Sequence, residues 1–190
     1  VTQGLWKAVM GTGVEEQMEK VGESDLYGVG DDYPMYYVSW DEAQEFVSKL
    51  SELTGKKYVL PTEAQWEYAA RGGVKSRGYK YSGSNTIDGV AWYWGNSEEK
   101  YSTSSVGTKL PNELGIYDMS GNVCEWCSDW YGDYSDVSQT DPTGPSSGSS
   151  RVFRGGSWLH DARDCRVSSR NRDHPDHRND ILGFRVALVF

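Results

Sequence analysis

Glycine supplies 22 of the 190 residues of this chain, and this content restricts the possible folds more than any other feature of the sequence. Glycine adopts positive φ angles at little cost and weakens the interior of a helix. A chain with this content is expected to turn often and to hold few long helices. The 8 Trp and 13 Tyr residues still provide large side chains for a core. Length and composition therefore predict one globular domain over residues 1–190.

The region around residue 40 has a strong helix pattern. Ser39 and Glu42 have the spacing of a capping box, in which each side chain binds the other residue's backbone N–H. Gly55 stands where a glycine commonly ends a helix. These signals predict a helix over residues 40–54. Its apolar side chains recur at helical spacing: Trp40, Ala43, Phe46, Val47, Leu50 and Leu53.

A second helix is predicted to begin after Thr62. Thr62 and Gln65 repeat the capping-box spacing, and Pro61 prevents an earlier start. Gly72 and Gly73 end the helical pattern. Beyond Gly73, glycine, serine, asparagine and aspartate separate short apolar runs, which predicts short strands and loops.

The charge of the chain restricts its partners. The net charge is −9 at pH 7, and an acidic surface repels phosphate, so we expect no nucleic acid partner. No apolar run approaches the ~20 residues that a membrane span needs. No signal peptide is visible, and the chain begins at Val1 rather than Met. We therefore expect an upstream segment that was removed or is not included.

Three cysteines raise the question of redox chemistry or metal binding. Cys124 and Cys127 have the spacing of a redox motif or half a zinc site. A zinc ribbon needs a second such pair, which the sequence lacks, and a thioredoxin-type pair opens a helix, whereas this segment reads as a Trp-rich strand. We expect two buried thiols. A zinc site that adds Cys165 and a histidine is the alternative.

Several phrases occur in the order typical of the formylglycine-generating-enzyme (sulfatase-modifying factor) family. They are VTQ at residues 1–3, VMG at 9–11, YVSW at 37–40, LPTEAQWEYAARGG at 60–73, PN at 111–112, LGIYDMSGNV at 114–123, RGGSW at 154–158 and LGFR at 182–185. The chain resembles this family nearly end to end. The resemblance implies an α+β, C-type-lectin-like fold of the formylglycine-generating-enzyme type, with two helices, small twisted antiparallel sheets and much irregular loop. We expect Trp158 in the core, and Arg154 and Arg185 paired with buried carboxylates or carbonyls.

The resemblance also bears on catalysis. In oxidase members of the family, two cysteines five positions apart follow the RGGS phrase, bind copper and activate oxygen. Here His160 or a neighbour stands at the first position and Cys165 at the second. One thiol cannot form a two-thiolate copper site. We therefore expect a protein that is not an enzyme and has no catalytic residues, with a formylglycine-generating-type oxidase or another enzyme of the family as the alternative.

The segment between Trp158 and Gly183 mixes positions that look fixed with positions that look free. The free positions are all reachable by changing the adenines of an asparagine codon, and none is Lys, Glu, Gln, Met or Trp. The C-terminal region, about residues 154–190, thus resembles the variable region of diversity-generating retroelement proteins, a class that includes treponemal variable lipoproteins. An ordinary loop of the family is the alternative. The free positions are Leu159, His160, Asp161, Asp164, Ser169, Asn171, Arg172, Asp173, His174, His177, Asn179, Asp180 and Ile181.

This second resemblance implies a ligand-binding receptor or display protein. The ligand is expected to be a protein or another surface ligand. The chain is expected to be a monomer at the cell surface or outside the cell, with a lipid anchor on a segment absent from this chain. The free positions should share one exposed face, because a binding surface is contiguous. Arg166, Val167 and Arg170 should point inward, Arg170 with a partner, and Pro175 should set a turn.

The binding function requires no cofactor, but the family resemblance implies a possible structural calcium ion. Asn122, Val123 and Glu125 lie in the phrase that supplies calcium-binding oxygens in oxidase relatives. Side-chain and carbonyl oxygens suit Ca²⁺. A turn at Asn122 with a solvated Glu125 is the alternative.

Overall fold

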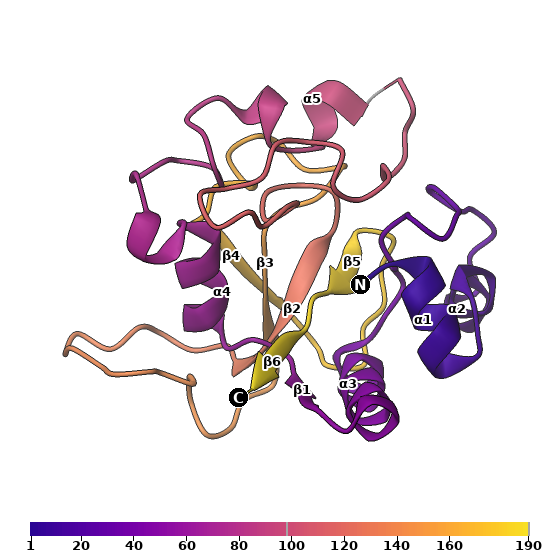
Figure 1. The fold of residues 1–190 in the computed structure, drawn as a ribbon. Coiled ribbons are helices and arrows are strands. Elements are labelled where there is room, and N and C mark those ends of the chain that lie inside the picture. The colour runs from indigo at the N-terminus through magenta and orange to yellow at the C-terminus, as the bar shows by residue number, and fades with distance from the viewer. Residues whose placement is uncertain (98, 190) are drawn as a thin grey trace.

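A computed structural model describes residues 1–97 and 99–189 and has a mixed arrangement of short helices and small curled sheets (Figure 1). This confirms the predicted fold class. The α-helices are α1 (Gln3–Met10), α2 (Val14–Val21), α3 (Trp40–Thr54), α4 (Glu63–Ala70) and α5 (Trp94–Ser97), with 3-10 turns η1 (Gly73–Lys75) and η2 (Ile87–Gly89). The strands are β1 (Lys57–Val59), β2 (Cys124–Trp130), β3 (Arg151–Arg154), β4 (Arg170–Asp173), β5 (Leu182–Phe184) and β6 (Ala187–Val189).

Helix α3 has the bounds predicted from the sequence. The Ser39 hydroxyl accepts the Glu42 N–H at 3.2 Å, and the Glu42 carboxylate accepts the Ser39 N–H at 3.0 Å. Gly55 ends the helix with a φ of 68°. The inward face packs Phe46 against Trp6 of α1 and Phe184 of β5, with the Trp6 and Phe46 ring centroids 5.6 Å apart and the rings stacked. Helix α4 likewise begins at its predicted cap.

The chain holds more helices than the two predicted. Helices α1 and α2 have eight residues each, and α5 has four. Short helices of this kind carry too few apolar positions for a clear periodic signal. Helix α1 is stabilised instead by tertiary packing, because Trp6 is fully buried against α3. No helix of the described residues is both long and apolar enough to cross a membrane.

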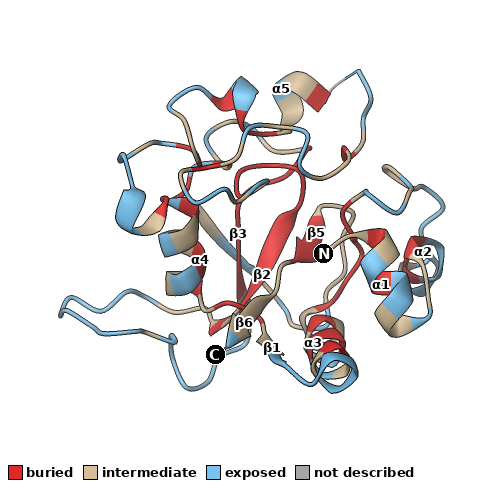
Figure 2. Ribbon diagram, in the orientation of Figure 1, coloured by how far each residue is buried: buried red, intermediate tan, exposed pale blue. Residues whose placement is uncertain are grey.

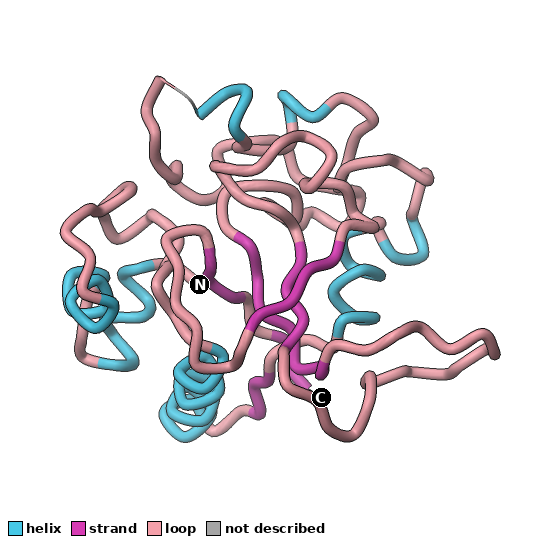
Figure 3. The backbone as a smooth tube through the Cα atoms, turned by 180° about the vertical axis from the view of Figure 1, so that it is seen from behind, coloured by secondary structure: helices cyan, strands magenta, loops and turns pink. Residues whose placement is uncertain are grey.

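The strands form two sheets, with helices and loops around them (Figure 3). The larger sheet has the order β4-β3-β2-β5, and β1 pairs with β6 in a separate ribbon. Contacts between β2 and β3 and between β3 and β4 are antiparallel, as predicted, whereas β2 and β5 run parallel. Figure 1 shows α1, α2 and α3 on one side of this sheet and α4 on the other.

The central strands are buried and most connecting loops are exposed (Figure 2). Trp158 and Trp66 are each only 1% exposed, so the prediction that Trp158 lies in the core is confirmed. The two predicted arginine pairs are also present. Arg154 is buried and pairs with Glu63 at 2.7 Å, and Arg185 pairs with Glu125 at 2.6 Å.

Candidate functional site

A small recess opens where the C-terminal segment passes over the sheet. We call it the His160 recess. It has a volume of about 150 Å³ and lies where β2 begins, where β3 ends and where β4 begins. Its walls combine backbone at two glycines with polar and charged side chains. The lining residues are Cys124, Phe153, Arg154, Gly155, Gly156, His160, Asp164, Ser169, Arg170 and Asn171.

His160 and Cys124 meet in this recess although they are 36 positions apart. The Nδ1 atom of His160 lies 3.6 Å from Sγ of Cys124 and 3.1 Å from Oγ of Ser157. Burial lowers the pKa of His160, against the opposing influence of Asp164 and Asp161. Burial raises the pKa of the Cys124 thiol. The pair is therefore a neutral imidazole beside a protonated thiol at neutral pH.

Cys165 lies beneath the same loop and is 0% exposed. A side chain at Gly156 would place its Cβ 2.7 Å from the Cys165 sulfur, and Gly156 has a φ of 71°. Only glycine suits both the conformation and the close approach. Burial raises the pKa of Cys165 to about 12. A thiol in this state is a weak nucleophile.

The three cysteines are free and buried, which confirms the prediction of two ordinary thiols at Cys124 and Cys127. The zinc alternative receives no support. Within residues 1–97 and 99–189, no group of three or more His, Cys, Asp or Glu side chains could hold a metal ion.

Arg170 links the recess to helix α4. Its guanidinium donates from Nε to Oε1 of Glu63 at 2.8 Å and from Nη2 to Oε2 at 2.6 Å. Arg154 shares the Glu63 carboxylate, and Tyr134 donates its hydroxyl to it at 3.0 Å. The prediction that Arg170 is paired is thus confirmed, and Val167 is buried as predicted.

The prediction for Arg166 is wrong, because Arg166 is exposed. It lies between Cys165 and Val167, whose side chains fill the interior. If Arg166 were buried beside them, its guanidinium would need a carboxylate partner, because an unpaired buried charge is costly. Pro175 lies in a turn, as predicted, with the His177 N–H bound to the His174 carbonyl at 3.0 Å.

The free positions of the sequence are all partly or fully exposed. The His160 recess brings together His160, Asp164, Ser169 and Asn171. Asn179 and Asp180 line a separate hollow of about 140 Å³ beside Tyr27 and Tyr37. The structure therefore gathers some free positions around one recess and distributes others along the rest of the C-terminal segment, so a single binding face remains a prediction. The other free positions are Leu159, Asp161, Arg172, Asp173, His174, His177 and Ile181.

The residues considered for calcium are held by the protein itself. Asn122 is 1% exposed, and its side chain forms two hydrogen bonds with the Ser104 backbone. Val123 is buried, and Glu125 accepts hydrogen bonds from Trp66 and Arg185 rather than facing solvent.

Asp118 is an additional oxygen donor that the sequence reading missed. It lines a hollow of about 310 Å³ together with Asn122, Val123 and Glu125. Its Oδ1 atom is buried without a hydrogen-bond partner among the described residues, and burial raises its pKa. An unpaired buried carboxylate oxygen suits a bound cation. Calcium at this hollow stays a prediction.

Comparison with known proteins adds to this geometry. The sequence profile of the sulfatase-modifying factor enzyme 1-like domain matches residues 1–189. The chain is 39% identical over 180 residues to a formylglycine-generating enzyme of Streptomyces coelicolor, covering 86% of the chain and 55% of that protein. It is 35% identical over 173 residues to a formylglycine-generating enzyme of Thermomonospora curvata, covering 82% and 55%. The chain thus spans about half the length of these relatives.

A solved structure is also similar. Treponema denticola variable protein 1 matches with a TM-score of 0.85 at 34% identity, covering 98% of this chain and 81% of that one. The two family resemblances seen in the sequence are confirmed. The expectation of a protein that is not an enzyme is corrected, because several relatives at 34–39% identity are named formylglycine-generating enzymes.

Proposed function

The chain belongs to the sulfatase-modifying factor enzyme 1-like domain family, and we propose that it is an enzyme of the formylglycine-generating type that binds its substrate at the His160 recess. The observation that carries this proposal is the meeting of the Cys124–His160 pair with Asp164, Ser169 and Asn171 around one hollow. A thiol, an imidazole and several hydrogen-bonding groups converge there, as they do in enzyme sites.

The size of the recess indicates which part of a substrate it takes. Pockets for whole small molecules measure about 300–1,000 Å³. A hollow of about 150 Å³ is suited to one side chain of a larger substrate. The remainder of the substrate would lie on the C-terminal segment, where free positions are accessible. We infer that the substrate is a polypeptide.

The copper centre expected for oxidase relatives does not fit these residues. His160 is at one of the two expected cysteine positions, and Cys165 at the other is fully buried with a raised pKa. Copper in such a centre is bound by thiolates. Instead, His160 and Ser169 line the recess and are available to orient a polar group, whereas the Arg170 guanidinium is already bound to Glu63 and to the Gly132 carbonyl.

Selection of peptides from a displayed library, followed by mass spectrometry, tests this function. In the Ser169→Trp variant the new side chain fills the recess and excludes a substrate side chain. Peptides that bind the wild-type domain are therefore expected to bind this variant at least ~10-fold more weakly. Arg163→Trp is the matched control, because Arg163 is exposed and outside the recess. Mass spectrometry of a bound peptide after incubation with the domain in air then distinguishes an enzyme, which changes the mass of the peptide, from a binding protein, which does not. Equal binding to both variants would contradict the proposed site.

A second candidate function is ligand binding by a diversified surface. The similarity to Treponema denticola variable protein 1 and the exposure of the free positions favour it. In this case the domain would act at the cell surface on a protein or other surface ligand. Peptides that bind at the recess without any change in mass would favour this candidate over the enzyme. Sibling gene copies with substitutions confined to adenines of the free codons would support it further.

A further inference from the structure

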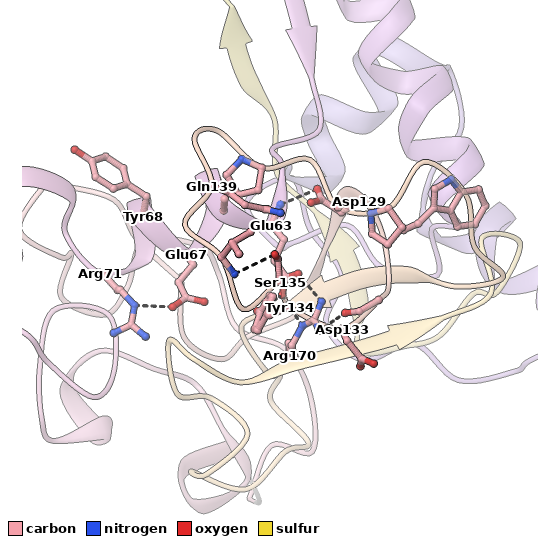
Figure 4. A pocket seen from close by; sticks show the side chains of 17 residues that line it. Glu63, Glu67, Tyr68, Arg71, Asp129, Asp133, Tyr134, Ser135, Gln139 and Arg170 are labelled. Atoms are coloured by element: carbon pink, nitrogen blue, oxygen red, sulfur yellow. Dashed lines mark hydrogen bonds and ion pairs between the residues drawn. The ribbon is translucent and has the colours of Figure 1, made fainter.

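Arg170 also lines a second, larger pocket, which we call the acidic pocket (Figure 4). Its volume is about 750 Å³, in the range of pockets that hold whole small ligands. One wall is the outer face of α4 with Glu67 and Tyr68, and the other is the long segment between β2 and β3. The lining residues are Glu63, Ala64, Glu67, Tyr68, Arg71, Asp129, Trp130, Gly132, Asp133, Tyr134, Ser135, Val137, Gln139, Pro142, Gly144, Pro145 and Arg170.

Two carboxylates of this pocket are already neutralised. Glu63 pairs with Arg170 and Arg154. Glu67 pairs with Arg154 and also with Arg71, the latter at 2.7 Å. Figure 4 shows the pair of Glu63 and Arg170 among the lining side chains. Together these ion pairs leave no anionic oxygen of Glu63 or Glu67 without a cationic partner.

The remaining two carboxylates form no ion pair with the residues that the structure describes, although the charge of Arg151 lies near enough to interact with Asp129. Asp129 is 5% exposed, and its Oδ2 atom accepts hydrogen bonds from the Glu63 N–H at 2.8 Å and the Ser128 hydroxyl at 3.1 Å. No hydrogen bond from the described residues reaches its Oδ1 atom. Asp133 is exposed and forms no ion pair with any residue that the structure describes. A buried carboxylate with one unused oxygen favours a positively charged partner.

The surroundings of Asp129 distinguish an organic cation from a metal ion. The described residues contain no group of three acidic, histidine or cysteine side chains that could hold a metal. The same pocket presents apolar surface from Trp130, Val137, Pro142 and Pro145. Aromatic and proline surfaces bury the apolar body of a ligand. The Trp130 ring already stacks on the Arg151 guanidinium, 3.4 Å from the ring centroid, so the ammonium group of a ligand is left to Asp129.

We propose that the acidic pocket binds an organic cation, in which an ammonium group pairs with Asp129 and an apolar body lies against Trp130 and the prolines. The source is either a small amine or a lysine side chain of a polypeptide. This site is separate from the His160 recess, so it can exist whether or not the proposed enzyme activity does.

Binding of matched probes to the complete chain, measured by calorimetry and NMR, tests this proposal. Benzylamine is expected to bind, and benzyl alcohol, which has the same ring without the charge, to bind at least ~10-fold more weakly. Acetyl-phenylalanyl-lysine amide and its norleucine counterpart test the polypeptide source in the same way. Tighter binding of the lysine peptide than of benzylamine assigns the site to a polypeptide, and the reverse assigns it to a small amine.

Two variants locate the binding. Asp129→Asn keeps the shape and the acceptor for the Glu63 N–H, and it should remove the preference for the charged probes. Asp136→Asn, on the same segment but outside the pocket lining, should leave it unchanged. Should Asp129→Asn fail to fold, Val137→Arg at an exposed position places a competing cation in the pocket and should abolish amine binding. Equal affinity for amine and alcohol, or wild-type amine binding by Asp129→Asn, would overturn the proposal, and so would no binding of either amine at millimolar concentration.

Discussion

Arg170 and Glu63 form a two-bond ion pair across 107 positions of the chain, with Nε–Oε1 and Nη2–Oε2 distances of 2.8 and 2.6 Å. The pair joins the first residue of β4 to the first residue of α4. Its two side chains are only 16% and 8% exposed. The pair therefore separates the His160 recess from the acidic pocket and holds in place the segment that carries the free positions.

Arg170→Leu is expected to destabilise the fold strongly. Removal of one partner leaves the buried Glu63 carboxylate less well compensated, which costs about 3–5 kcal/mol. Arg154 still contacts Glu63, so the lower end of this range is expected. Urea unfolding of the variant measures the loss. Arg172→Leu, at an exposed position of the same strand, is the control and should change stability by less than ~1 kcal/mol, because it loses only an exposed contact with the Tyr131 ring.

The dependence of the unfolding free energy on pH should show that folding lowers the pKa of the Glu42 carboxyl group. Burial alone raises its pKa, but hydrogen bonds from Arg178 and Lys20 outweigh burial and bring the pKa to about 2 from an ordinary value of 4.5. Because the folded pKa is the lower one, this stabilisation is complete above about pH 4.5 and is lost as the pH falls towards 2. The difference corresponds to ~3 kcal/mol.

Unfolding by urea at several pH values below 5 measures this loss. In a plot of the unfolding free energy against pH, the slope should be smaller for the Glu42→Gln variant, because this variant lacks the titrating carboxyl group. Glu45→Gln, at an exposed neighbouring position that pairs with Lys49, should keep the wild-type dependence of the unfolding free energy on pH. Identical slopes for wild type and Glu42→Gln would show that the pKa of Glu42 is not lowered by folding.

Core and surface positions of the C-terminal region should respond differently to truncation. Trp158→Ala and Trp66→Ala remove fully buried rings and should each cost about 3–5 kcal/mol. Asp161→Ala and His177→Ala change partly or fully exposed side chains and should each stay within ~0.5 kcal/mol. Thermal unfolding of the four variants measures both sets. Comparable losses in the two sets would mean that the free positions are structural.

The sequence was most informative where structure is local. The bounds of α3 follow from Ser39, Glu42 and Gly55, which lie within or next to the helix they delimit. Helix α1 was missed because burial of Trp6 depends on α3, which no local pattern reveals. The exposure of Arg166 also depends on distant parts of the chain. Its neighbours Cys165 and Val167 fill the interior, and the sequence does not show which arginines have a carboxylate within reach.

The candidate site was predictable in its parts but not in its assembly. His160 was identified as a free position and Cys124 as a buried thiol, yet their contact at 3.6 Å depends on how the loop after β3 crosses β2. Gly155 and Gly156 permit that crossing, and the sequence shows only that they are glycines. The acidic pocket was not predicted at all. Its walls come from α4 and from residues 129–145, which are brought together by pairing of β2 with β3.

Calcium is expected to raise the melting temperature of the domain through Asp118. An ion that binds only the folded state stabilises it by about 2.7 kcal/mol at 100 times its dissociation constant. Asp118→Asn removes the charge of the unpaired buried oxygen and should abolish the increase. Asp136→Asn, at an exposed position far along the chain, should keep it. A wild-type melting temperature that calcium leaves unchanged would contradict a site at this hollow.

Thiol labelling tests the state of the His160 recess directly. Burial raises the pKa of Cys124, Cys127 and Cys165, and protonated buried thiols react slowly with iodoacetamide. The native protein at pH 7 should therefore remain unlabelled until it unfolds. Cys165→Ala should fold and show the same slow labelling at the other two positions.

Mass spectrometry of peptides from the labelled protein identifies which cysteine reacts. Of the three, Cys124 lines the recess and lies beside an imidazole that could accept its proton. Raising the pH should consequently label Cys124 before Cys127 and Cys165, and His160→Phe should slow this reaction because the acceptor is lost. Rapid labelling of Cys124 already at neutral pH would instead mean that the native recess holds a thiolate. Cys165 or Cys127 reacting first would show that the recess is not the most accessible thiol site.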